Sequence, residues 1–391
     1  MSDQPSHSIP LLPFRVYYWT VIFLASLGLA DAIYLSQSHY RVYTDVRYMS
    51  FCAISKAINC DTVSQSPYSI LWGIPVPVWG IIGYAFVLTL LVYAGAQSAE
   101  KQRMWSILLI VTLFYSLFSI ALGVISAYEI HSYCLMCIVS YAINFLLLYY
   151  AWLIRRRFAS NGLIDDILLD VRYLKHQQKI PVLIMSAGFI IVITGLGTLM
   201  PPYWRMTLSP LSAAVSTGIT DDGHPWIGAA HPLLEITEYS DYQCFQCKKM
   251  YYFLRRIIAE NPDSIRLIHR HYPMDSKVNP LVKEPFHVGS AAMSLLAICA
   301  QSQGKFWEMN DILFNIDMSK GIMNPSELLS RVGIDAAGHS TNISDPHYMV
   351  QLLSDIRTGM KLGLSGTPGF VIDGHLYQGQ IPAELLKKIM K

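Results

Sequence analysis

Charge is what this sequence has least of. Charged residues make up 14% of its 391 residues and hydrophobic residues 53%, whereas about a quarter of an average soluble domain is charged. The net charge of +2 is too small to favour a nucleic-acid partner, and neither a basic stretch interleaved with aromatic residues nor a glycine-rich phosphate loop occurs. The composition therefore argues against nucleic acid as a partner and favours a lipid bilayer.

The apolar residues are concentrated in one half of the chain. Residues 1–200 contain nearly all the long apolar runs, while residues 201–391 resemble a soluble domain in composition. A membrane-spanning helix needs ~20 mostly apolar residues. The segments that meet this requirement are Phe14–Leu35, Gly73–Ala94, Met104–Ala127, Cys134–Leu153 and Ile180–Met200. The first is expected to remain a span rather than a cleaved signal peptide, because its apolar run continues past the small residues Gly28-Leu29-Ala30.

Basic residues near the span ends predict the orientation, since cytoplasmic loops are enriched in Lys and Arg. Between the second and third spans lie Lys101 and Arg103, and between the fourth and fifth lie Arg155, Arg156, Arg157, Arg172, Lys175 and Lys179. Both loops are therefore expected in the cytoplasm. This predicts a multi-pass protein of the inner (plasma) membrane with a cytoplasmic amino terminus and a periplasmic or otherwise extracytoplasmic carboxy-terminal domain.

Cysteine is absent from both predicted cytoplasmic loops. Six of the seven cysteines form three pairs on the predicted outer side: Cys52 and Cys60, Cys134 and Cys137, Cys244 and Cys247. Such pairing in a membrane protein suggests redox exchange. A carrier of reducing equivalents across the bilayer would need thiols on both faces. The electrons are therefore expected to leave through an acceptor dissolved in the membrane, and a quinone is the simplest one.

The two membrane-side pairs differ in their local setting. Cys134 and Cys137 begin an apolar helix, whose free N–H groups and positive dipole end stabilise a thiolate. Cys52 and Cys60 lie in a loop, from which a disulfide can exchange with two partners. Spacing alone leaves a static disulfide open for each pair. A zinc site shared with the outer C-x-x-C is a poor alternative because a span intervenes, and no metal is expected.

The order of these motifs resembles the vitamin K epoxide reductase family. The motif residues are Cys52, Cys60-Asp61-Thr62-Val63, Ser66, Trp72-Gly73-Ile74-Pro75, and Cys134-x-x-Cys137 followed by Tyr141-Ala142. The resemblance implies a four-helix bundle around a quinone (ubiquinone or menaquinone) with Cys137 nearest the ring. It also implies that Cys134 receives electrons from Cys60, and that Cys52 faces the redox partner. Ser66 would donate a hydrogen bond to a quinone oxygen, unless it is a plain turn serine. Tyr141 either faces the ring or merely packs.

The outer half has a different pattern. Residues 201–230 are rich in Pro, Gly, Ser and Ala and are predicted to be a linker. A strand at Leu233–Tyr239 precedes Cys244-Phe245-Gln246-Cys247, which opens a helix through Ile258, and this layout is typical of a thioredoxin-like redox site. Further predictions are a strand at Ile265–Tyr272, helices within Asn279–Leu364 and a hairpin turning at Asp373-Gly374.

Leu233–Lys391 resembles the DsbA-like branch of the thioredoxin superfamily, in which a helical subdomain is inserted. The resemblance implies that Cys244 is the exposed exchanging sulfur, that Cys247 is the resolving thiol, and that Pro368 is a cis-proline facing them. It makes Glu238 a buried proton-relaying acid; the alternatives are a solvent-facing glutamate and a trans-proline turn. Strongly oxidising relatives carry Pro-His between the cysteines, so Phe245-Gln246 argues against an extreme oxidant. Cys299 is expected to be a core residue.

The predicted organisation is a four-helix transmembrane domain (1–157), a cytoplasmic loop with a fifth linking span (158–204), a linker (205–230) and an α/β thioredoxin-like domain with a helical insertion (231–391). The predicted function is quinone-dependent disulfide formation in reduced secreted or periplasmic proteins. Electrons would pass from Cys244/Cys247 through Cys52/Cys60 to Cys134/Cys137 and the quinone pool. The alternatives are a quinone or vitamin K epoxide reductase with the fused domain as its electron donor, a tethered thioredoxin-fold chaperone or binding module, and a transmembrane reductant conduit.

Overall fold

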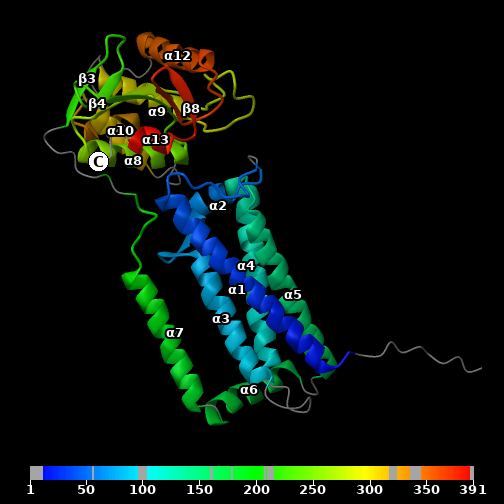
Figure 1. The fold of residues 1–391 in the computed structure, drawn as a ribbon. Helices are drawn as coiled ribbons and strands as arrows, with labels where there is room; N and C mark the ends of the chain where they lie inside the picture. Colours follow the sequence, from blue (N-terminus) through cyan, green and yellow to red (C-terminus); the bar gives the residue numbers. More distant parts are fainter. Residues whose placement is uncertain are drawn as a thin grey trace, which may run out of the picture. The chain divides into compact units, whose positions relative to one another are not determined.

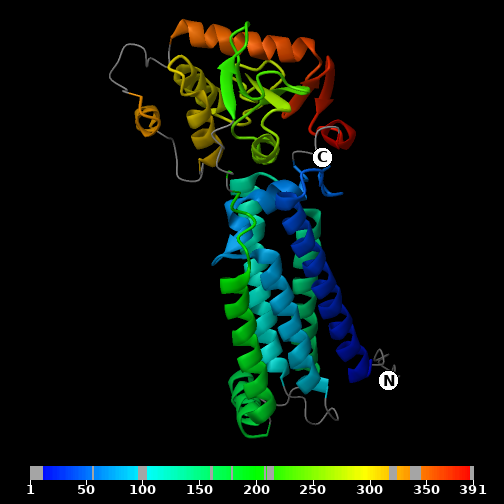
Figure 2. The same cartoon turned by 60° about the vertical axis from the view of Figure 1, so that its left-hand side comes forward.

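The computed structural model describes residues 12–54, 57–95, 104–158, 162–177, 179–206, 208, 215–316, 324–334 and 345–387. The chain divides into two compact units, Met1–Trp204 and Arg205–Lys391 (Figures 1 and 2). Lys101 and Arg103, which contribute to the predicted orientation, lie outside the described residues. The side chains of Lys175 and Lys179 lie outside them as well.

Four long apolar helices form a bundle in the first unit (Figure 2). They are α1 (Phe14–Thr44), α3 (Val76–Gly95), α4 (Trp105–Ile125, continued by the π-helical turn Ser126–Ile130) and α5 (Leu135–Phe158). Each is long and apolar enough to cross a membrane. Their outer surfaces expose large apolar side chains such as Trp19 and Phe114, each more than half exposed, as expected of a surface that faces lipid. The predicted four-helix membrane core is confirmed.

Two further helices follow the bundle. The predicted cytoplasmic loop contains a helix that its sequence pattern did not indicate, α6 (Leu163–Gln177). The next helix, α7 (Lys179–Leu199), coincides with the predicted fifth span and contacts α3 through the rings of Phe189 and Phe86, whose centroids are 5.8 Å apart. The apolar stretch found within its described residues is Ser186–Leu196. This is shorter than a span, so the fifth crossing stays a prediction.

A compact cap connects α1 to α3. It contains the short helix α2 (Cys60–Gln65), a 3-10 turn at Pro67–Ser69, and a hairpin whose strands have two residues each, β1 (Ile70–Leu71) and β2 (Ile74–Pro75). The Asn59 side chain accepts hydrogen bonds from the backbone N–H groups of residues 61 and 62. Because an asparagine at this position satisfies the free N–H groups of a helix, α2 begins at Cys60.

The second unit has a six-stranded mixed sheet with the order β3-β4-β6-β5-β7-β8. Its strands are β3 (Ser216–Ile219), β4 (Pro225–Gly228), β5 (Leu234–Ser240), β6 (Ile265–His271), β7 (Gly369–Ile372) and β8 (His375–Gln378). The helices are α8 (Phe245–Glu260), α9 (Ser290–Gln301), α10 (Phe306–Asn315), α11 (Pro325–Arg331), α12 (Pro346–Lys361) and α13 (Ala383–Lys387). The parallel strands β5 and β6 are joined through α8, which is the βαβ unit expected after a C-x-x-C-containing helix.

The hairpin predicted at Asp373-Gly374 is present and joins β7 to β8. Both turn residues have positive φ, 51° and 77°. Two-residue hairpin loops favour such backbone angles, and Gly and Asp accept them more readily than most residues.

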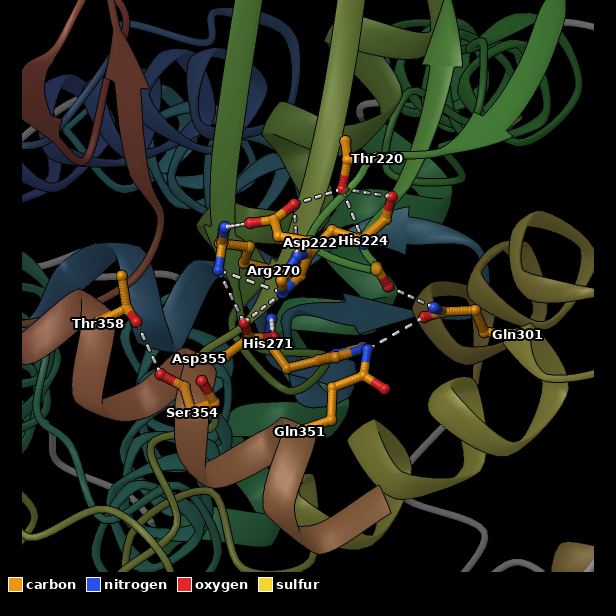
Figure 3. A network of polar contacts seen from close by, with 11 residues as sticks. Thr220, Asp222, His224, Arg270, His271, Gln301, Gln351, Ser354, Asp355 and Thr358 are labelled. Atoms are coloured by element: carbon orange, nitrogen blue, oxygen red, sulfur yellow. Dashed lines mark hydrogen bonds and ion pairs between the residues drawn. The ribbon is translucent and has the colours of Figure 1, made fainter. Parts of the chain in front are cut away.

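The predicted linker 205–230 is wrong for residues 216–228, which form β3 and β4. Trp226 and Ile227 of β4 pair with β6, which extends the sheet. The turn before β4 is held by side chains (Figure 3): His224 Nε2 lies 2.7 Å from Asp355 Oδ1, and Arg270 lies 3.2 Å from the same oxygen. These partners come from α12 and β6, so the strands are stabilised by contacts that the local composition does not reveal.

Candidate active site

Four cysteines gather at one end of the membrane bundle. Cys52 and Cys60 form a disulfide with their Cα atoms 5.6 Å apart, while Cys134 and Cys137 are reduced. Cys52, Cys60 and Cys134 are buried in one cluster, against which Cys137 packs. Cys52 is 0% exposed, so a redox partner can reach its sulfur only if the loop moves.

Backbone hydrogen bonds bring the two pairs together. The N–H of Asn59 donates to the carbonyl of Tyr133 over 2.9 Å, and the N–H of Tyr133 donates to the carbonyl of Ala57 over 2.8 Å. Asn59 and Tyr133 each directly precede a cysteine, Cys60 and Cys134. The cap therefore holds the loop disulfide beside the C-x-x-C, as disulfide exchange by direct attack requires.

Cys134 occupies the start of α5. The backbone N–H of Cys137 donates to Cys134 Sγ over 3.2 Å. An N–H group at a helix start stabilises negative charge on a sulfur. The first cysteine of this pair is therefore placed to react as a thiolate, whereas Cys137 lies one turn further into the bundle.

A cavity of about 360 Å³ opens beside Cys137. Its wall is mostly aromatic and aliphatic, with Trp79 and Tyr84 of α3 and Tyr115 of α4 among the lining residues. Ser66 and Tyr141 also line it, and the Ser66 hydroxyl donates to the carbonyl of Val63 over 2.8 Å. A volume of this size lies in the usual range for small-molecule sites. A mostly apolar cavity with aromatic rings, a thiol and several hydroxyl groups in its wall suits a quinone ring.

The second C-x-x-C begins α8. Cys244 is the N-cap residue, and the N–H of Cys247 donates to its Sγ over 3.4 Å. Cys244 is half-buried and Cys247 is fully buried. The Cys244 thiol also donates to the carbonyl of Thr367 over 3.4 Å, and the Thr367-Pro368 peptide bond is cis, as expected. Cys244 is thus the accessible sulfur, with the cis-proline loop beside it.

The two sulfurs of this pair have opposite protonation tendencies. The hydrogen bond with Cys247 and the charge of His287 lower the pKa of Cys244 to about 7. Burial raises the pKa of Cys247 well above its ordinary value, and the neighbouring Cys244 adds to the effect. Near neutral pH, Cys244 is therefore partly a thiolate, while Cys247 holds its proton.

Glu238 of β5 is a buried acid near this pair. Its side chain is 0% exposed, which rules out the solvent-facing alternative. Within the described residues, neither carboxyl oxygen makes a hydrogen bond of standard geometry, and His269 Nδ1 lies 4.0 Å from Oε2. Burial raises the pKa of Glu238 to about 8. Glu238 also interacts electrostatically with Cys244 and Cys247, so a protonatable carboxyl lies within range of both sulfurs.

Two residues that shape this site, Asp241 and His287, were not among the predicted site residues. One Asp241 oxygen accepts from the N–H of Gln243 over 2.7 Å, and the other lies 2.9 Å from His287 Nδ1. Asp241 thereby fixes the turn before Cys244 and holds His287 in place. An aspartate just before the C-x-x-C is a turn signal, but the distant histidine has no local signal. In the described part of the chain, no group of three or more His, Cys, Asp or Glu residues could hold a metal ion.

Two family models match the chain. Residues 19–152 match the vitamin K epoxide reductase family, and residues 220–391 match a thioredoxin family. Residues 153–219, which contain α6, α7 and β3, lie between the two matches.

Curated relatives match only in part. The Na(+)/H(+) antiporter NhaA 1 of Salinispora arenicola is 25% identical over 223 residues, which cover 54% of this chain and 32% of that protein. The Na(+)/H(+) antiporter NhaA 3 of Salinispora tropica is 25% identical over 154 residues, or 39% and 22%. This chain therefore spans a third or less of these relatives, and antiporter activity is said of those proteins alone.

Solved structures show low overall similarity to this chain. A thioredoxin-like oxidoreductase from Silicibacter pomeroyi is 21% identical, covering 44% of this chain and 91% of that one, with a TM-score of 0.36. BdbD from Bacillus subtilis in its oxidised form is 16% identical, covering 45% and 96%, with a TM-score of 0.35. The assignment of the two domains rests on the family models and on the observed fold.

Proposed function

We propose that the chain is a thiol:disulfide oxidoreductase that passes electrons from reduced exported proteins to a membrane quinone. The match of residues 19–152 to the vitamin K epoxide reductase family and of residues 220–391 to a thioredoxin family supports this proposal. The observation that carries this proposal is the arrangement in the membrane unit. There the loop disulfide packs against a C-x-x-C whose second cysteine lines an apolar cavity.

Electrons enter at the thioredoxin-like domain. A substrate thiolate attacks the oxidised pair at Cys244, the more accessible sulfur, and the Cys247 sulfur leaves. The second substrate thiol then attacks the mixed disulfide, which releases an oxidised substrate and the reduced pair. Glu238 exchanges the proton of Cys247 during these steps. A buried acid with a pKa of about 8 suits this role, because general acids and bases work best near the operating pH.

Electrons then pass through the loop pair. The reduced Cys244 thiolate attacks the loop disulfide at Cys52, and the Cys60 sulfur leaves. Cys247 then attacks Cys244 in the mixed disulfide, which frees Cys52 and oxidises the outer pair again. The freed Cys60 thiolate attacks an oxidised Cys134–Cys137 pair at Cys134, and Cys137 leaves at the cavity wall. Cys52 then closes on Cys60.

A quinone, when bound, supplies an acceptor for two electrons and two protons. Cys137 would lie beside its ring, with Ser66 and Tyr141 placed to donate hydrogen bonds. The outer domain would lie in the periplasm or an equivalent compartment, where disulfides persist. The amino terminus would lie in the cytoplasm, and the substrates would be reduced secreted or periplasmic proteins.

The test is oxidation of a reduced, unfolded dithiol protein by the purified full chain in detergent, with ubiquinone, with menaquinone or without quinone. The variants are Cys137→Ala and Cys244→Ala, with Cys299→Ala as the control because this buried cysteine belongs to none of the three pairs. Quinone-dependent turnover is expected in the wild type and the control only. Turnover that persists in Cys244→Ala would place the entry point elsewhere, and turnover that ignores quinone would refute the acceptor.

A further inference from the structure

An acidic residue lies within the first membrane-spanning helix. Asp31 is the eighteenth of the 31 residues of α1, and its side chain is 6% exposed. In the part of the chain that the structure describes, its Oδ1 atom has no hydrogen-bond partner. A carboxyl inside a span is energetically expensive, and such residues commonly mark sites that carry protons or ligands.

The other oxygen of Asp31 accepts a hydrogen bond from the Ser140 hydroxyl of α5. Ser140 follows Cys137 by three residues and therefore lies on the same helix face. Ser140 and Cys137 both line the cavity, whereas Asp31 is not among its lining residues. The hydroxyl thus connects the buried carboxyl to the space beside the reacting sulfur.

A polar side chain one turn further along α5 directs its hydrogen bonds elsewhere. Asn144 of α5 accepts from the Tyr84 hydroxyl over 2.9 Å and donates to Ser119 over 2.9 Å. The titratable groups that interact with Asp31 are Tyr84 of α3, Cys134 and Cys137. Asp31 is therefore the carboxyl in electrostatic contact with both sulfurs of the membrane pair.

We propose that Asp31 is the internal proton donor for quinone reduction and that the Ser140 hydroxyl transfers its proton. This inference rests on the proposed function. Oxidation of a Cys134 thiolate and a Cys137 thiol to a disulfide yields two electrons and one proton. Formation of a quinol takes up two electrons and two protons. The missing proton comes from Asp31. The Ser140 hydroxyl turns so that it donates into the cavity and accepts from the protonated carboxyl, and it then releases its own proton and takes the one from Asp31.

Asp31 then regains a proton from the outer aqueous side, where Cys134 released one on becoming a thiolate. The net reaction is two thiols plus quinone giving a disulfide plus quinol. If a buried carboxyl delivers this proton, quinol formation does not need water in the cavity as the proton donor. General acid groups in such positions contribute about 100- to 10,000-fold to a rate.

The first test does not need quinone. The infrared spectrum of the reduced, quinone-free full chain in detergent is compared for the wild type, Asp31→Asn, Ser140→Ala and Asp45→Asn. Asp45 lies at the end of the same helix, exposed and paired with Arg41, and is the matched control. Glu238 gives a protonated-carboxyl band of its own, which is identified by its loss in Glu238→Gln. A second such band is expected, present in the wild type and Asp45→Asn, missing in Asp31→Asn and shifted in Ser140→Ala. A second band unaffected by Asp31→Asn would overturn the proposal.

The second test separates two half-reactions. Quinol formation by the prereduced chain in a single turnover should slow about 100-fold in Asp31→Asn. Reduction of the Cys134–Cys137 disulfide by dithiothreitol, followed by thiol labelling, should keep its rate. Ser140→Thr retains a hydroxyl and should restore most of the rate lost in Ser140→Ala, which guards against a mere packing defect.

The outcomes distinguish the two proposals. A wild type that forms no quinol contradicts the proposed function. A wild type that forms quinol while Asp31→Asn or Ser140→Ala keeps its rate refutes the role of Asp31 alone. Equal slowing in Ser140→Thr and Ser140→Ala would also refute it, because a hydroxyl would then have no part in the step.

Discussion

Replacing Glu238 by glutamine removes an ionisable carboxyl from the core of the outer domain while preserving its size. In the folded chain, burial raises the pKa of this carboxyl from 4.5 to about 8, so at pH 7 it holds a proton there and has lost it in the unfolded chain. Each pH unit above the ordinary pKa costs the folded state about 1.4 kcal/mol. Glu238→Gln should therefore stabilise the outer domain by about 3 kcal/mol at pH 7.

The size of this stabilisation depends on pH. The carboxyl places no penalty on the fold below pH 4.5, and its penalty grows as the pH rises toward the folded pKa of about 8. The gain from glutamine should thus fall below about 1 kcal/mol at pH 5.

Pulse proteolysis of the full chain in urea measures the stability gain at pH 5 and at pH 7. The readout is the amount of intact outer domain. Glu235→Gln, on the same strand but exposed, is the control and should change stability by less than about 0.5 kcal/mol. Equal gains at the two pH values, or a loss at pH 7, would refute the assignment of Glu238 as a buried protonated acid.

Three further perturbations address the site and the fold. His287→Ala should raise the pKa of Cys244 and so reduce the thiolate absorbance at pH 7, because the histidine charge lowers that pKa; an unchanged titration curve would count against this contact. Ser66→Ala should weaken quinone binding about fivefold, because one hydrogen bond is worth about 1 kcal/mol. The KM for quinone in the turnover assay measures this effect. An unchanged KM would mean that Ser66 is only a turn serine. Gly228→Ala should destabilise the outer domain by at least about 2 kcal/mol in urea unfolding. A Cβ there would lie 2.0 Å from the carbonyl oxygen of Ile265, and the φ angle of residue 228 is +117°. An unfolding midpoint equal to that of the wild type would contradict that geometry.

Features encoded within a few residues could be predicted from the sequence. The helix starts at Cys134 and Cys244 and the turn at Asp373-Gly374 depend on local backbone preferences. The cis bond before Pro368 followed from its place ahead of the last hairpin together with the family resemblance. The apolar runs likewise determined four spans, because bilayer thickness fixes their length.

Features made by residues distant in sequence could not be predicted. Strands β3 and β4 are short and rich in turn-forming residues, and they are stable because β6 pairs with β4. Asp31 and Ser140 are 109 residues apart, and His287 is 46 residues from Asp241. The only sequence signal for Asp31 is an acidic residue within an apolar run. This signal does not predict its hydrogen-bond partner Ser140.

The two C-x-x-C pairs share one physical arrangement despite their different surroundings. In each, the first cysteine begins a helix and accepts an N–H from the second, at 3.2 Å for Cys134 and 3.4 Å for Cys244. In each, a buried carboxyl from another element, Asp31 or Glu238, interacts electrostatically with both sulfurs. The helix start stabilises the attacking thiolate, but it cannot move the proton that each exchange gains or releases. The two proposals assign that proton movement to a buried acid beside each pair, Glu238 in the outer domain and Asp31 in the membrane bundle.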